Sequence, residues 1–494
     1  MLRDSAIYVA GKALPGALGF ATAMLLTWFL PPEDLGLYGV GMAAVALANN
    51  AVFEWLGACV LRWYTTHQND PAFMPTVLAL FACAASTGAL LVLGASLLGL
   101  TGGHDRLVWL LLFGSLAYGW FEFAARLQIC RGRPAHYLCM SLLRNGLILA
   151  GCAAVAHLTG SAEATLLAGF AAMAAAGCLF LRPPRPRCWT RFDPALAREF
   201  VAFGAPVALT MILSGLATTA TPITVGIMAG YEAVGAFAVG MTIVQSTLGV
   251  ISGGVSSAVY PAAVRAVESG DAPAARAVLA GNCTMLLALL LPAGVGLAMV
   301  SPQIAAVFVE PRYHDALARA MPWLAAGAAL SGVRATYVEY AFHLGKRTRD
   351  LVQVVGGAAV VNLGAGVALI PVWHEIGAAV ALCCASGVAL VHAAVLARRA
   401  YPIPFPVKEA CGICLAVAAM AATLWALPVA ADGAPGLARQ VVCGFVAYAA
   451  ALGLLAASAR GSVQGAALFL SPARSRRATA AHGRRLPPSG GASP

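Results

Sequence analysis

Charged side chains are scarce in this sequence. Asp, Glu, Lys and Arg make up 10% of its 494 residues, whereas ordinary soluble domains contain about 25%. Hydrophobic residues make up 60% of the chain, and the mean hydropathy is +0.81. So few charges cannot cover a water-exposed surface of this size, which excludes a soluble enzyme held by a single membrane anchor.

Motifs for nucleotides, metals and disulfides are also missing. Gly345-Lys346 has neither the preceding glycine nor the following Ser or Thr that a P-loop requires. Cys411 and Cys414 form a C-x-x-C pair without a second pair or an accompanying histidine. Most of the 13 cysteines lie inside apolar runs, where they act as small hydrophobic residues. We therefore expect no cofactor, no bound metal and no disulfide framework.

Long apolar runs follow one another along the chain with short interruptions. A hydrocarbon layer of about 30 Å needs about 20 apolar residues per helix, and backbone groups in lipid must bond within their own segment. The runs therefore predict an all-α integral membrane protein with about 14 transmembrane helices. The expected spans are 6–30, 36–61, 75–100, 107–129, 134–158, 163–181, 200–229, 234–260, 275–300, 320–343, 351–372, 375–397, 409–429 and 436–458.

The positions of the basic residues test this topology independently of hydropathy. With both termini on one side, 23 of the 31 Lys and Arg residues lie on that side, four on the other side and four within spans. Cytoplasmic loops collect positive charge, so we expect cytoplasmic N- and C-termini in a multi-pass protein of a bacterial inner membrane. The net charge of +11 follows from this topology, and no nucleic-acid partner is expected.

The chain contains an internal repeat. A shift of 199 residues places Gly36 on Gly235, and a shift of 217 places Glu122 on Glu339. Duplicated halves are typical of transporters that rock about a central site. The expected domains are an N-terminal six-helix bundle (1–181), a basic cytoplasmic linker (182–198), a C-terminal six-helix bundle (199–400), an extra helix pair (401–459) and a basic disordered cytoplasmic tail (460–494).

Several short motifs resemble, in their order and spacing, those of a known family. They are Pro32-Glu33-Asp34-Leu35-Gly36-Leu37-Tyr38, its echo Glu232-Ala233-Val234-Gly235-Ala236-Phe237, then Gly345-Lys346-Arg347-Thr348-Arg349, Asn362, and Ile370-Pro371 followed by Gly377-Ala378-Ala379. They look like the motifs of Wzx-type polysaccharide flippases in the multidrug/oligosaccharidyl-lipid/polysaccharide exporter superfamily. The resemblance covers roughly residues 1–400.

The resemblance implies a fold and a function. The fold would be two six-helix bundles in a MATE-like V around a central cavity. The function would be translocation, by alternating access, of an undecaprenyl-diphosphate-linked oligosaccharide for exopolysaccharide, capsule or O-antigen synthesis. Expected partners are this lipid-linked oligosaccharide, membrane lipids, and a polysaccharide polymerase with its export machinery. The extra pair 409–429 and 436–458 departs from the commoner twelve-span pattern and matches lipid II flippases of the same superfamily.

Cationic residues within the spans are the first candidates for a substrate site. An ionisable group in a span costs about 2.5–3.5 kcal/mol to insert and usually faces a cavity or a partner. Arg144 and Arg334 lie near the middle of their spans, and Lys12 lies near the cytoplasmic start of the first. Because a guanidinium can bond two phosphate oxygens at once, we expect these cations to bind the substrate diphosphate. The alternative is a structural pair for each arginine and contact with headgroups for Lys12.

Acidic residues within the spans are candidates for coupling or gating. Glu122 and Arg126 are four residues apart, and the 217-residue shift converts them into Glu339 and His343 at the same spacing. Residues at this spacing share a helix face, so each set predicts a structural pair or a latch sensitive to pH or cations. Glu54, which has no partner in its own span, could bind a coupling cation; the alternative is an interhelical hydrogen bond or a pair with a cavity cation such as Lys12.

Uncharged polar residues deep in the spans are candidates for lining a cavity. The hydroxyls of the seventh span recur every three or four residues, a stripe that could contact sugar but that also serves close helix packing. The candidates are Asn49, Asn50, Thr210, Ser214, Thr218 and Gln245.

Two other functions stay open at this point. A cation-coupled multidrug antiporter of the same fold would want carboxylates in its cavity, whereas the buried cations favour an anionic substrate. A membrane glycan polymerase or ligase would need catalytic residues in a sizeable outer loop. The longest expected outer loop, 301–319, offers only Glu310, His314 and Asp315, so we expect a transporter and not an enzyme.

Overall fold

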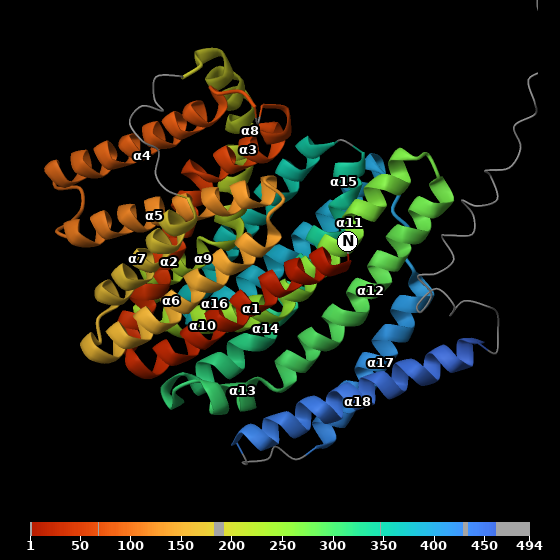
Figure 1. Cartoon of the computed structure of the whole chain (residues 1–494). Helices are drawn as coiled ribbons and strands as arrows, with labels where there is room; N and C mark the ends of the chain where they lie inside the picture. Colours follow the sequence, from red (N-terminus) through yellow and green to blue (C-terminus); the bar gives the residue numbers. More distant parts are fainter. Residues whose placement is uncertain (1, 68, 182–191, 346, 428–432, 461–494) are drawn as a thin grey trace, which may run out of the picture.

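The structure is a computed structural model that describes residues 2–67, 69–181, 192–345, 347–427 and 433–460 (Figure 1). All regular elements in these ranges are helices. The first seven are α1 (Leu2–Phe29), α2 (Pro32–Val52), α3 (Glu54–His67), α4 (Phe73–Leu97), α5 (Asp105–Cys130), α6 (Pro134–Thr159) and α7 (Ala162–Phe180).

The second set of helices starts at α8. It comprises α8 (Pro194–Thr218), α9 (Thr221–Ala229), α10 (Tyr231–Val244), η2 (Gln245–Gly249), α11 (Val250–Glu268), α12 (Ala272–Met299), α13 (Ser301–Phe308), η3 (Pro311–Tyr313), α14 (His314–Val333), η4 (Arg334–Val338), α15 (Tyr340–Leu344) and α16 (Thr348–Ala400). Two further helices, α17 (Val407–Ala426) and α18 (Gly433–Arg460), follow.

The all-α membrane architecture expected from the apolar runs is confirmed. Within the described ranges, 11 helices are long and apolar enough to cross a membrane. One of them, Arg349–Ala400, covers two expected spans, and a kink at His374 (φ 48°) divides it. Each expected span overlaps one or more helices, while the total of 14 membrane crossings stays a prediction.

Several spans are interrupted where the sequence predicts single helices. α2 and α3 separate at Phe53, and α8 and α9 separate between Thr218 and Thr221. The π-helical segments η2 and η4 interrupt two others. Broken helices and π-bulges are typical of transporter binding regions. Hydropathy cannot locate these interruptions because apolar composition continues across each of them.

The two sets of helices meet closely where α2 crosses α10. A Cβ on Gly36 of α2 would overlap the backbone of Tyr231, and a Cβ on Gly235 of α10 would lie 3.4 Å from Leu35. Gly36 and Gly235 are the glycines that the internal repeat aligns. Small residues let helix backbones approach each other in lipid, and α1 contacts α10 and α11 across the same boundary.

The last two helices lie beside the main bundle. α17 and α18 pack against each other and against α12 (Figure 1). The Tyr448 hydroxyl of α18 donates a hydrogen bond to the backbone oxygen of Ala288 at 2.8 Å. Most of the expected linker 182–198 and the tail after residue 460 lie outside the described residues. The described part resumes before α8, where the Asp193 carboxylate caps the helix.

Candidate functional site

A cavity of about 420 Å³ lies between the two sets of helices. Helices α1, α2, α5, α6 and α7 line it on one side, and α9 and α10 line it on the other. Arg144 is the only charged side chain among the described residues that line this central cavity. Its uncharged polar lining consists of Thr22, Tyr38, Tyr118, Asn145 and Thr242.

Arg144 is held loosely at the edge of the central cavity. Its Nη1 atom lies 3.5 Å from Oε1 of Glu122 on α5, and its Cζ atom lies 4.3 Å from the centroid of the Phe121 ring. Its Nε atom is buried and has no hydrogen-bond partner among the described residues. A guanidinium stays charged in proteins, so Arg144 brings a positive charge to the cavity, while its buried Nε donor is unused.

Arg126 bonds to Glu54 and not to Glu122, which precedes it by one turn. Its Nη2 atom bonds to the Glu54 carboxylate, and its Nη1 atom donates to the backbone oxygen of Glu54 at 2.9 Å. Gly57 makes this contact possible, because a Cβ there would overlap the guanidinium. The expectation of a Glu122–Arg126 pair within one helix was therefore wrong, since partners on α3 and α6 approach more closely.

A second, much smaller cavity lies on the other side of Glu122. Its volume of about 10 Å³ is near the minimum that holds one water molecule. Asn49, Glu54, Glu122 and Arg126 provide its polar lining. Asn49 is 2% exposed, and its Oδ1 atom has no hydrogen-bond partner in the described structure. The Glu122–Arg144 pair thus stands between a large cavity that Arg144 lines and a small one that Glu122 lines.

Arg334 lies away from the central cavity. It begins the π-helical segment η4 and bonds to Glu339, the residue between η4 and α15. His343, expected to act with Glu339, is exposed, and its ring centroid lies 6.1 Å from that of Tyr260. The two glutamates that the repeat aligns, Glu122 and Glu339, therefore each pair with an arginine. The two arginines, Arg144 and Arg334, do not occupy equivalent positions in the repeat.

The remaining candidates whose side chains the structure describes do not line the central cavity. Asn49 lines the small cavity, while the Nδ2 atom of Asn50 lies 3.4 Å from a Cβ built on Gly215 of α8. The Thr210 hydroxyl donates to the Pro206 oxygen of its own helix at 3.0 Å, and Ser214 has an interaction within the structure. Gln245 begins η2 and is exposed. The side chains of Lys12 and Thr218 lie outside the described residues.

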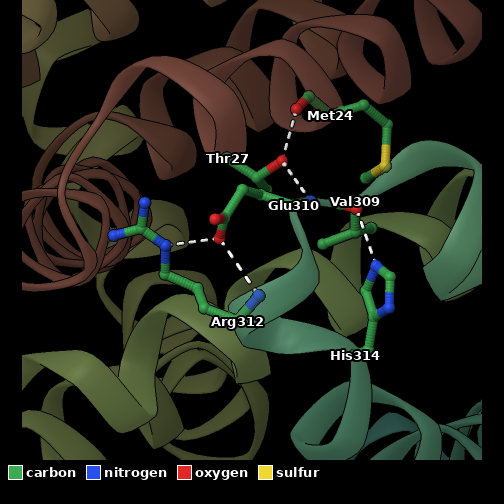
Figure 2. A network of polar contacts seen from close by, with 6 residues as sticks. All are labelled: Met24, Thr27, Val309, Glu310, Arg312 and His314. Carbon is green, nitrogen blue, oxygen red and sulfur yellow. Dashed lines mark hydrogen bonds and ion pairs between the residues drawn. The ribbon is translucent and has the colours of Figure 1, made fainter.

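The end of α1 distant from the N-terminus is tied to the segment between α13 and α14 (Figure 2). The backbone N–H of Glu310 donates to the Thr27 hydroxyl at 3.4 Å, and the Glu310 carboxylate bonds to Arg312. The neighbouring Trp28 indole donates to the Phe308 oxygen at 3.4 Å. The expected outer loop 301–319 is therefore mostly helical and holds α1 at this end.

A third cavity, also of about 420 Å³, lies between α12, α17 and α18. No charged residue lines it among the described side chains, and its most polar members are Gln440, Thr247 and Tyr448. This apolar groove has no group to neutralise a diphosphate, so the central cavity is the better site for an anion.

Sequence reasoning missed several cavity residues. Tyr118 carried no signal, because a single tyrosine in an apolar span most often packs against other helices. Asn145 follows Arg144 directly and aligns with Asn362 in the repeat, which could have marked it. Its Nδ2 atom donates to the Ser141 oxygen at 2.8 Å, while Asn362 donates to the Thr221 hydroxyl at 2.9 Å.

Comparison with known structures shows the same fold in a group of membrane transporters. A lipid II flippase, MurJ, in an inward closed conformation superposes with a TM-score of 0.73 at 14% identity, covering 89% of this chain and 96% of that one. An inward-facing multidrug MATE transporter of the MOP superfamily gives 0.59 at 15% identity, with coverage of 79% and 97%. A MOP superfamily transporter from Pyrococcus furiosus gives 0.52 at 13% identity, with coverage of 81% and 94%.

Sequence comparison then gives the family. No curated protein matches the chain. The family model described as polysaccharide biosynthesis protein matches residues 25–318, which is more than half of the chain. This match shows that the chain belongs to the polysaccharide biosynthesis protein family.

Proposed function

We propose that this protein translocates an undecaprenyl-diphosphate-linked oligosaccharide across a bacterial inner membrane for exopolysaccharide, capsule or O-antigen synthesis. The observation that carries the proposal is the position of Arg144, the charged residue lining the cavity between the two sets of helices. A diphosphate brings negative charge into a region of low dielectric constant, where a guanidinium can bond two of its oxygens in parallel. The polysaccharide biosynthesis family supports the same substrate class.

The other cavity residues suit the sugar next to the diphosphate. Tyr38 and Tyr118 bring aromatic rings with hydroxyl groups to the lining, and Asn145 and Thr242 add an amide and a hydroxyl group. Pockets that fix small ligands combine apolar walls with a few such polar groups. The polyprenyl tail stays in lipid, so the cavity holds only the diphosphate and the sugars near it.

Alternating access would use the expected halves, residues 1–181 and 199–400. In the proposed orientation both termini are cytoplasmic, so the contact between Thr27 and Glu310 lies at the periplasmic end of α1. The tight crossing at Gly36 and Tyr231 closes the same end. Release to the periplasm then requires both contacts to separate, and transport needs no covalent step.

Arg334 and Lys12 are proposed as further stations for the diphosphate. Arg334 has a buried Nε atom without a partner in the described structure, as Arg144 does. Glu54, Glu339 and His343 are proposed to influence which conformation is preferred. A change of conformation would have to bring Arg334 to the substrate path, because it lies outside the central cavity here.

Reconstitution tests the proposal. Flipping of a labelled polyprenyl-diphosphate oligosaccharide is measured in proteoliposomes for the wild type, Arg144→Ala, and the exposed control Arg276→Ala. Loss of charged hydrogen bonds worth about 1.5–3 kcal/mol predicts flipping about 10- to 100-fold slower in Arg144→Ala. The control should flip like the wild type. Failure of the wild type to flip several such lipids, together with efflux of a cationic dye, would contradict the proposal and favour a multidrug antiporter.

A further inference from the structure

The Glu122–Arg144 pair separates two cavities of very different size. Arg144 lines the central cavity of about 420 Å³, and Glu122 lines the small cavity of about 10 Å³. The pair is long, at 3.5 Å, and neither side chain is fully enclosed, with 20% and 30% of their surfaces exposed. Each member therefore has a second place where it can meet an ion of opposite charge.

The small cavity is built to receive a positive charge or a donor. The Asn49 Oδ1 atom is buried without a hydrogen-bond partner, and the carboxylates of Glu54 and Glu122 line the same space. All three present oxygen acceptors, while the one cationic lining residue, Arg126, is already bonded to Glu54. An unpaired buried oxygen is costly, and a space of one water molecule admits only a small species.

The charges around Glu122 limit what can bind. The groups that act on its carboxylate are Arg144 of α6, Arg126 of its own helix and Glu54 of α3. The titratable Tyr118 also lies on α5 beside it. α4 has no charged residue, and the single acid of α7, Glu163, lies in that helix's first turn. The charges of the two carboxylates and the two guanidinium groups cancel. A cation added while Arg144 is still paired with Glu122 would therefore leave one excess positive charge.

We propose that Glu122 and Asn49 form a site for one monovalent cation, a proton or a sodium ion, which replaces Arg144 as the counter-ion of Glu122 when Arg144 binds the substrate diphosphate. This inference rests on the proposed function. The exchange keeps every buried charge compensated: the anion meets Arg144 in the large cavity, and the cation meets Glu122 in the small one. A proton on Glu122 donates to the Asn49 oxygen, whereas a sodium ion takes oxygens of Asn49 and Glu122 as ligands.

Such an exchange makes the two ligands bind cooperatively. If the cation raises the affinity for the diphosphate, the diphosphate raises the affinity for the cation by the same factor. If the cation is a proton, the affinity for a prenyl diphosphate falls about tenfold for each unit that the pH rises. If the cation is sodium, the affinity falls on removing sodium at constant pH.

The test uses undecaprenyl diphosphate without sugar as the probe. Its binding to the full chain in detergent is measured by calorimetry from pH 6 to pH 9, with and without sodium, and in two buffers of different ionisation enthalpy. The wild type is compared with Glu122→Gln and with the control Glu163→Gln, an exposed carboxylate at the start of α7. Because ionisation of the probe itself is common to all three proteins, only the difference between them reports on Glu122.

In the wild type and in Glu163→Gln, we expect one cation to bind together with the probe. In Glu122→Gln, we expect no cation uptake except the protons exchanged by the probe itself. Glu122→Gln should also bind the probe at least as tightly as the wild type does at high pH, because Arg144 is then free. If Glu122→Gln does not fold, Asn49→Leu replaces it and should weaken the linkage.

Two results would overturn the inference in different ways. Equal dependence of probe binding on pH and sodium in the wild type and in Glu122→Gln would contradict the cation site alone. Arg126 would then be the counter-ion of Glu122 when Arg144 binds the diphosphate. Absence of probe binding to the wild type under every condition would sink the proposed function, and the cation site with it.

Discussion

Arg144 of α6 and Glu122 of α5 lie 3.5 Å apart across two neighbouring helices, while Arg126, one turn from Glu122, bonds to Glu54 of α3. Four half-buried charges on α3, α5 and α6 are thus connected into two pairs. The pairing leaves Arg144 at the central cavity with an unused donor.

Gly57→Ala should break the Glu54–Arg126 pair. The added methyl group would overlap the Arg126 guanidinium, and overpacking of this kind costs about 1–3 kcal/mol. We expect a lower thermal unfolding midpoint in detergent. Gly281→Ala on α12 is the matched control, because its Cβ would meet no atom within 4 Å. Equal midpoints for the two variants would show that α3 and α5 adjust without loss.

Gly36→Ala should separate the two sets of helices where α2 crosses α10. The obstacle is the backbone of Tyr231, which cannot rotate away as a side chain can, so the helices must move apart. We expect faster amide hydrogen exchange in 19–29 and 301–313, the segments that close this end. Gly94→Ala, whose Cβ would lie in open space, should exchange like the wild type, and unchanged exchange in Gly36→Ala would refute the crossing as a closure.

Arg334→Met should leave Glu339 without its partner. Removing one member of a buried ion pair costs about 3–5 kcal/mol, whereas replacing both members with apolar residues is often nearly neutral. We expect Arg334→Met to unfold at a lower temperature and the double variant Arg334→Met with Glu339→Leu to recover most of that loss. Because Arg334 is proposed to bind the diphosphate, the folded double variant should flip lipid poorly. Normal flipping by the double variant would assign Arg334 a structural role only.

Tyr313→Phe should make stability less sensitive to alkaline pH. Tyr313 is 3% exposed, its hydroxyl has no partner in the described structure, and burial raises its pKa to about 12. The unfolded value is about 10, so the contribution of the neutral hydroxyl is complete below pH 10 and is lost as the pH rises through about 12.

The measurement for Tyr313 is denaturant unfolding at pH 8 and pH 11. The wild type should lose about 1.4 kcal/mol more than Tyr313→Phe between these pH values, because pH 11 lies about one unit above the unfolded pKa and one unit below the folded pKa. At pH 8 the variant should be at least as stable, because it lacks a buried hydroxyl without a partner. Parallel losses in both proteins would mean that Tyr313 ionises as freely as an exposed tyrosine.

The sequence by itself determined that this chain is an all-α membrane protein and where its apolar segments lie. Those features follow from local chemistry, since each apolar segment must satisfy its own backbone in lipid. The motifs around Gly36 and Gly235 also indicated the exporter superfamily and the family that the comparisons show. The sequence also marked Arg144 as a candidate, because a charge in the middle of a span is costly to insert and usually faces a cavity or a partner.

Only the tertiary structure decided which charges meet. The spacing of Glu122 and Arg126 predicted a pair, but Glu54 reaches Arg126 through the space that Gly57 leaves. Arg334 and Arg144 looked equivalent in the sequence, yet only Arg144 reaches the cavity, because depth in a span says nothing about which way a helix faces. Contacts between helices depend on how whole segments pack, and that information is absent from any one of them.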